Sequence, residues 1–122
     1  MIEEKVLGFE NSITSYVYLE FANDNKHYYR QSRCFYKMTI EIIEMGVDPE
    51  RYDPDLYSGQ RVKECIFRDV LQQWYENRQE KNFGEMHSML SKTELEPLFT
   101  YALSRINWDE IAISLIRDIE EP

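Results

Sequence analysis

The stretch GVDPERYDPDLYSG, residues 46–59, carries enough carboxylates to bind a cation or a basic protein surface. Its acids are Asp48, Glu50, Asp53 and Asp55. A calcium loop needs about six to eight oxygen ligands at alternating positions around a tight glycine turn. This spacing differs from that pattern, and Pro49 and Pro54 stiffen a stretch that has no interior glycine. The simplest interpretation is a solvated connector between helices, and the alternatives are a weak divalent-cation site and an acidic docking surface.

A second candidate site consists of four bases that would share one face of a helix. They are Lys26, Arg30, Arg33 and Lys37. Such a face could bind phosphate or an acidic partner. It could equally be a solvated face, balanced at its end by Glu41 and Glu44 through intrahelical pairs. We keep it as an alternative, anion-binding site.

The residues that could act as nucleophiles or metal ligands do not form a known constellation. His27 and Cys34 are two helical turns apart, about 10 Å along an axis, which is too far for a hydrogen bond. Cys65 falls in an apolar stripe, where we expect a buried thiol, and His87 has no partner at metal-ligand spacing. P-loop, GxSxG, HExxH and dinucleotide-binding motifs are absent from the sequence. We therefore predict a non-enzymatic protein without catalytic residues, metal ligands or cofactor, although 23 acids leave a chance pair of catalytic carboxylates open.

The net charge points to the class of partner. With 23 acids against 14 bases, the chain carries −9, whereas a general nucleic-acid binder is expected to be basic. Residues 1–25, 46–60 and 94–122 carry net charges of −4, −3 and −5. If folding joined these segments, they would form a strongly negative surface that attracts basic proteins. The plainer interpretation is that the acids only keep the protein soluble.

Length and composition fit one small acidic domain over residues 1–122, since 43% of the residues are hydrophobic. The opening MIEEKVLGF has acids where a secretory signal has bases, and no apolar run approaches the roughly 18 residues of a membrane span. Two cysteines without a CxxC motif suggest reduced thiols. We expect a cytoplasmic protein that does not bind membranes.

Helical periodicity then predicts the elements that position these residues. We expect helices over residues 25–45, 59–78, 91–106 and 107–119, with a polar link over 77–84. Asp24 or Asn25 would cap the first helix and Gly46 would end it. Ser58 would cap the second, and Asn107 would cap the last as part of a capping box with Glu110. Residues 46–59 are thus expected to form an acidic loop between two helices.

The N-terminal part is ambiguous between strand and helix. Ile13, Val17, Leu19 and Phe21 alternate as in a strand, so residues 2–21 could form a β-hairpin. As a helix, the same segment would place Glu20 on its apolar face. We predict a mainly α fold, a compact bundle of about four to five helices with a possible N-terminal hairpin.

Two functions are compatible with this sequence. The first is a protein that binds and inhibits a basic partner, such as a nucleic-acid-handling enzyme, in the manner of antirestriction, anti-CRISPR or immunity proteins or of a DNA mimic. Its expected contact residues are Asp48, Glu50, Tyr52, Asp53, Asp55 and Tyr57. The second is a small regulatory module that binds a ligand or nucleic acid through Lys26–Lys37. The charge makes direct nucleic-acid binding the weaker expectation.

Overall fold

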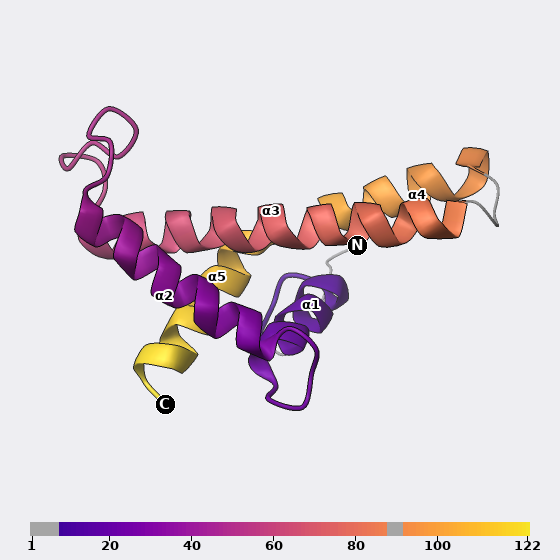
Figure 1. Ribbon diagram of the computed structural model, residues 1–122, viewed down its shortest axis with the longest axis horizontal. Helices are drawn as coiled ribbons and strands as arrows, with labels where there is room; N and C mark the ends of the chain where they lie inside the picture. The colour runs from indigo at the N-terminus through magenta and orange to yellow at the C-terminus, as the bar shows by residue number, and fades with distance from the viewer. Residues whose placement is uncertain (1–7, 88–91) are drawn as a thin grey trace.

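The computed structural model describes residues 8–87 and 92–122, with side chains described for 8–81 and 97–122. These residues form five helices and no strand, which confirms the mainly α prediction (Figure 1). The helices are α1 (Ser12–Ala22), α2 (Tyr29–Met45), α3 (Gly59–His87), α4 (Lys92–Ser104) and α5 (Trp108–Glu120). In Figure 1, α2 runs obliquely across α3, with α1 at one end of α2 and the 46–58 loop at the other.

The second arm of the possible hairpin is helical, so the strand alternative is wrong for residues 12–21. Residues 2–7 of its first arm lie outside the described residues. The Asn11 side chain accepts the Thr14 N–H at 2.8 Å and caps α1. Val17 and Phe21, one turn apart, are then buried together, and this packing outweighs β-propensity. Glu20 is only 8% exposed, as the helical alternative required.

The start of α2 differs from the prediction, because the chain makes a turn before the helix begins. Asn25 donates its N–H to the Asn23 side chain at 3.0 Å, and Lys26 donates to the Asn23 carbonyl at 2.9 Å. Neither Asp24 nor Asn25 therefore caps the helix, and Lys26 lies in the turn rather than on α2. The predicted end is confirmed, since Gly46 follows Met45 with a φ of 105°.

The polar link expected over residues 77–84 does not exist, because α3 continues unbroken to His87. Residues 78–81 of this segment are Arg, Gln, Glu and Lys, which have high helix propensity. Arg78 also lies over the Tyr28 and Trp74 rings at 5.5 and 5.6 Å, so tertiary contacts continue into the expected link. The start of α3 is as predicted, with the Ser58 hydroxyl accepting the Arg61 N–H at 3.1 Å.

The caps of α1 and α5 are joined to each other. Asn107 caps α5 as predicted and accepts the Glu110 N–H at 3.1 Å. The rest of the capping box is replaced by contacts with the N-terminal segment. Asn107 donates its own N–H to the Thr14 hydroxyl at 2.9 Å, and the Glu110 carboxylate accepts the Glu10 N–H at 3.0 Å.

A mixed aliphatic and aromatic core lies where α1, α3 and α5 meet. Its fully buried members include Val17, Phe21, Phe67, Leu71, Ile111 and Leu115. The Trp108 ring packs against Tyr75 at a centroid distance of 5.3 Å. Cys65 is 4% exposed, as its apolar stripe predicted. No helix in the described part of the chain is both long and apolar enough to span a bilayer.

Candidate functional site

The acidic loop consists of two successive five-residue turns, DPERY and DPDLY. In the first turn, an Asp48 carboxylate oxygen accepts the Glu50 N–H at 2.9 Å. The Asp48 carbonyl accepts the Tyr52 N–H, also at 2.9 Å. The same two bonds recur at 2.9 Å in the second turn, among Asp53, Asp55 and Tyr57. The repeated Asp-Pro pair therefore gives each turn an internal brace.

The two tyrosines brace the loop further. The rings of Tyr52 and Tyr57 meet edge to face with centroids 5.6 Å apart, and both side chains are half-buried. Burial raises the pKa of the Tyr52 phenol. The Arg51 guanidinium lies over the Tyr52 ring at 5.4 Å and donates to Asp69 on α3 at 3.2 Å. The loop is thus anchored to α3, with much of the tyrosine surface used inside it.

The loop carboxylates do not converge on a common point. Asp48 and Asp53 each accept an N–H within a separate turn, while Glu50 and Asp55 are exposed. Among the described residues there is no group of three or more His, Cys, Asp or Glu placed to hold a metal ion. The geometry of the described loop therefore gives no support to the divalent-site alternative.

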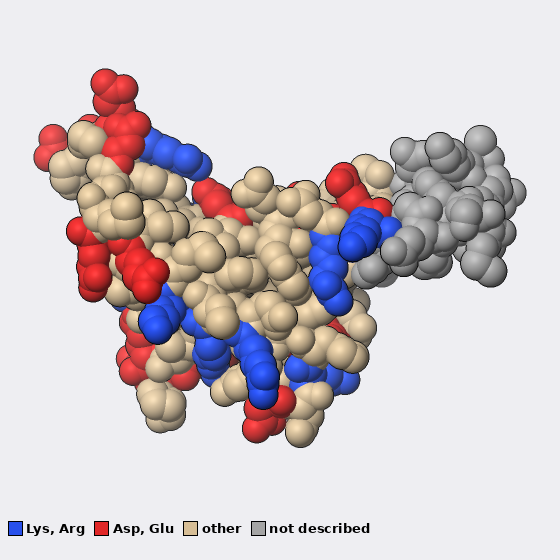
Figure 2. All heavy atoms as spheres, in the orientation of Figure 1, with Lys and Arg blue, Asp and Glu red and all other residues tan. Residues whose placement is uncertain are grey.

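The end of the molecule that carries the loop is strongly acidic. Figure 1 shows the loop projecting beyond α2 and α3, and Figure 2 shows Asp and Glu gathered at this end. We use the term acidic end for Glu41, Glu44, Asp48, Glu50, Asp53 and Asp55. None of these six forms an ion pair within the described residues. Six carboxylates without an ion-pair partner among the described residues therefore lie at one end of the molecule.

The described acids of α5 are engaged elsewhere, and those near α1 lie at the far end of α2 from the loop. The 17 residues of α2 separate the loop from α1 by about 26 Å. On α5, Asp109 accepts bonds from Arg61 at 2.9 Å and Arg68 at 3.3 Å. Glu120 accepts bonds from Lys63 and Tyr36, and these two bonds lower its pKa. Carboxylates of α5 are thus used to hold the helices together.

Beside the acidic end, α2 exposes an apolar stripe that sequence reasoning missed. Met38, Ile42 and Met45 are 42%, 36% and 87% exposed. Thr39, one turn before Ile42 on α2, is fully buried, so the exposed stripe lies directly beside the buried face of the helix. The i, i+4, i+7 spacing of Met38, Ile42 and Met45 places them on one flank of α2. Whether that flank is exposed depends on which side of α2 faces α3, and the sequence alone does not show this.

A groove of about 390 Å³ lies between Ile42 of this stripe, the loop and α3. We call it the α2–α3 groove, and its lining includes Ile42, Val47, Asp48, Arg51, Tyr52, Ile66, Asp69 and Val70. Aliphatic side chains from both helices thus line the groove together with carboxylates from the loop and α3. Such a surface can receive apolar and cationic groups side by side.

Three of the four bases, Arg30, Arg33 and Lys37, lie on the N-terminal half of α2, and Lys26 lies in the turn before it. Figure 2 shows Lys and Arg side chains gathered there. Arg30 and Lys37 are exposed, whereas Arg33 lies 4.5 Å over the Tyr29 ring and donates to its hydroxyl at 3.3 Å. Within the described part of the chain, none of these bases or Lys26 forms an ion pair. This cluster is therefore distinct from the acidic end.

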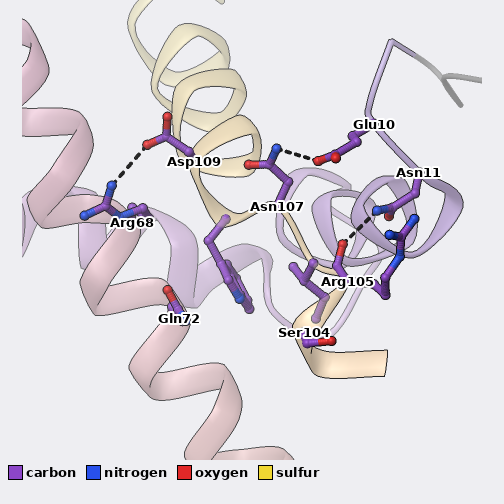
Figure 3. Close-up of a pocket in the computed structure, with 10 residues that line it drawn as sticks. Glu10, Asn11, Arg68, Gln72, Ser104, Arg105, Asn107 and Asp109 are labelled. Carbon is purple, nitrogen blue, oxygen red and sulfur yellow. Dashed lines mark hydrogen bonds and ion pairs between the residues drawn. The ribbon is translucent and has the colours of Figure 1, made fainter. Parts of the chain in front are cut away.

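A second concavity, of about 360 Å³, lies where the Glu10 segment, α3 and the turn before α5 meet (Figure 3). Its charged groups are bonded across these segments. Arg68 donates to Asp109 at 3.3 Å, and Asn107 donates to Glu10 at 2.8 Å. Asn11 donates to the Arg105 carbonyl at 2.7 Å. These bonds account for the concavity as a polar joint between helices.

Comparison with known proteins gives this chain no relatives. No protein-family model, no curated protein and no solved structure matches it.

Proposed function

We propose that this chain is a protein–protein interaction module that binds a basic protein surface through its acidic end. The observation that carries the proposal is the set of six carboxylates at one end, unpaired within the described residues. Unpaired charges keep their full field for a partner, and a negative field speeds the approach of a basic surface.

The braces within the loop support the same proposal. An acidic loop that orders only on binding loses affinity to the entropy of ordering. Here the turns at Asp48 and Asp53 are already closed, and Arg51 ties the loop to α3. The loop can therefore present Glu50 and Asp55 with little further ordering.

The kind of partner that we favour is a nucleic-acid-handling enzyme. A groove that binds nucleic acid is lined with Lys and Arg, and carboxylates on a projecting loop can occupy the places of phosphates. The proposed role is then inhibition of such an enzyme, as an antirestriction, anti-CRISPR or immunity protein would perform it.

The test compares two variants that remove the same charge from different places. The acidic-end variant carries Glu44→Gln, Glu50→Gln and Asp55→Asn. The control carries Glu80→Gln, Glu121→Gln and Asp24→Asn, which replace exposed acids away from the loop.

Each tagged protein captures partners from nuclease-treated lysate of the source cell or its host. A basic protein should be retained by the wild type and the control and reduced about tenfold on the acidic-end variant, since three exposed pairs at about 0.5 kcal/mol each sum to roughly 1.5 kcal/mol. Equal capture by all three proteins would contradict the proposal.

The basic cluster of α2 supports a second candidate, a regulatory module that binds an anionic ligand or nucleic acid. Its support is that Arg30 and Lys37 are exposed and lack acidic partners in the described part of the chain. Under this alternative, capture would vanish with nuclease and with the double variant Arg30→Gln, Lys37→Gln. Capture that persists through both changes would exclude nucleic acid as the bridge.

A further inference from the structure

We propose that the partner segment bound at the acidic end is a basic amphipathic helix. Its apolar face would lie on Met38, Ile42 and Met45 and enter the α2–α3 groove, while its Lys and Arg contact the acidic end. This inference rests on the proposed function and adds the shape and chemistry of the bound segment.

The first support is the apolar stripe itself. Single exposed apolar residues are ordinary, but Met38, Ile42 and Met45 are consecutive members of one helical stripe. Leu56 in the adjacent loop is also 79% exposed. Methionine side chains are flexible and polarisable, which suits a surface that adapts to an incoming apolar face.

The second support is room for side chains beside the stripe. A cavity of roughly 150 Å³ already holds a benzene ring. The α2–α3 groove offers about 390 Å³, and Ile42 belongs both to its lining and to the stripe. Ile66, 8% exposed, and Val70 contribute an apolar wall from α3. Aliphatic side chains of a partner can therefore enter this open groove.

The third support is charge, which selects a basic partner over a second copy of the chain. Pairing two acidic ends would oppose like charges on molecules that each carry −9. A segment with Lys or Arg beside its apolar residues instead meets Glu41 and Glu44 on α2 and the loop acids beyond Met45. The partner segment must therefore carry both basic charge and apolar surface.

The fourth support is spacing, which favours a helix. Met38 and Met45 are seven residues apart on α2, about 10 Å along its axis. An amphipathic helix repeats its apolar anchors at i, i+3, i+4 and i+7 over the same length. The apolar residues of a partner helix can therefore contact the apolar stripe of α2 at matching intervals along its length.

The test uses synthetic peptides as probes, because the natural partner is not identified. The first peptide, roughly 16 residues long to span the length of α2, has leucines at i, i+3, i+4 and i+7 and lysines elsewhere. A second peptide has the same composition with the leucines spread around the helix. A third keeps the leucine pattern and replaces lysine with glutamate. The wild-type chain carries ¹³C-labelled methionine methyl groups, so NMR reports binding at Met38 and Met45, with the chain's other methionines as references.

We expect the first peptide to bind at least tenfold more tightly than the other two and to shift the Met38 and Met45 methyl resonances. Met45→Ser should weaken binding by about fivefold, because it removes one apolar anchor without touching the core. Leu98→Ser is the matched control on α4, where Leu98 is 65% exposed, and should leave affinity unchanged. The acidic-end variant should weaken binding as well.

Equal binding of the scattered-leucine peptide, or unmoved Met38 and Met45 resonances, would overturn the inference. If the peptides fail while a captured basic protein still depends on the acidic end, the inference falls and the proposed function stands. If capture also shows no dependence on the acidic end, both fall.

Discussion

Thr14 joins the first and last described helices, and removing its hydroxyl should destabilise the whole fold. Thr14 is fully buried, donates to the Asn11 side chain at 2.8 Å and accepts the Asn107 N–H at 2.9 Å. Thr14→Val keeps the shape and removes both bonds. Leaving the Asn107 N–H without its acceptor costs about 1–3 kcal/mol, and the second lost bond adds roughly 1 kcal/mol.

We therefore expect Thr14→Val to lower the free energy of unfolding by about 2–4 kcal/mol. At the usual unfolding entropy per residue, this is a fall in Tm of roughly 8–16 °C for a chain of this length. Thr14→Ser is the control, since it keeps the hydroxyl and loses one buried methyl group, at about 1 kcal/mol. Thermal and urea melts followed by circular dichroism measure all three proteins. A Thr14→Val protein as stable as Thr14→Ser would refute the role assigned to these bonds.

Two further predictions concern pH. Bonds from Lys63 and Tyr36 lower the pKa of Glu120, so their stabilisation is present above the ordinary glutamate pKa and is lost as pH falls through the lowered value. Urea melts from pH 6 to pH 3 should therefore show a smaller loss of stability for Glu120→Gln than for the wild type, and parallel curves would contradict this. Burial, aided at Tyr18 and Tyr36 by hydrogen bonds to carboxylates, raises the pKa of Tyr18, Tyr36 and Tyr75 to about 12. This stabilisation is complete below about pH 10 and is lost as pH rises toward 12. Absorbance at 295 nm should show these phenols ionising later than in the urea-unfolded chain, and a single transition near pH 10 would contradict the prediction.

Helix boundaries were predictable where a local signal sets them. Asn107 and Ser58 cap α5 and α3, and Gly46 ends α2, because each needs only its own neighbours in the chain. A local signal did not predict that residues 12–22 form a helix. Their β-branched and aromatic residues favour a strand, but the burial of Val17 and Phe21 against other helices stabilises the helical conformation instead.

The same distinction between local and long-range signals applies to the features of the candidate site. The turns of the acidic loop follow from their Asp-Pro pairs, a local signal. Which carboxylates stay free depends on long-range contacts, such as the bond from Arg61 to Asp109, 48 residues away. The apolar stripe at Met38 and Met45 depends on how α2 meets α3. The amino-acid composition gives the number of charged residues but does not show which of them lack an ion-pair partner in the fold.

The most direct test of the central claim is the affinity of the captured basic partner for three proteins at two salt concentrations. These proteins are the wild type, the acidic-end variant and the charge-matched control. The account predicts equal Kd for the wild type and the control. It predicts binding about tenfold weaker, with a flatter salt dependence, for the acidic-end variant. The same Kd for all three proteins would contradict the claim that Glu44, Glu50 and Asp55 contact the partner.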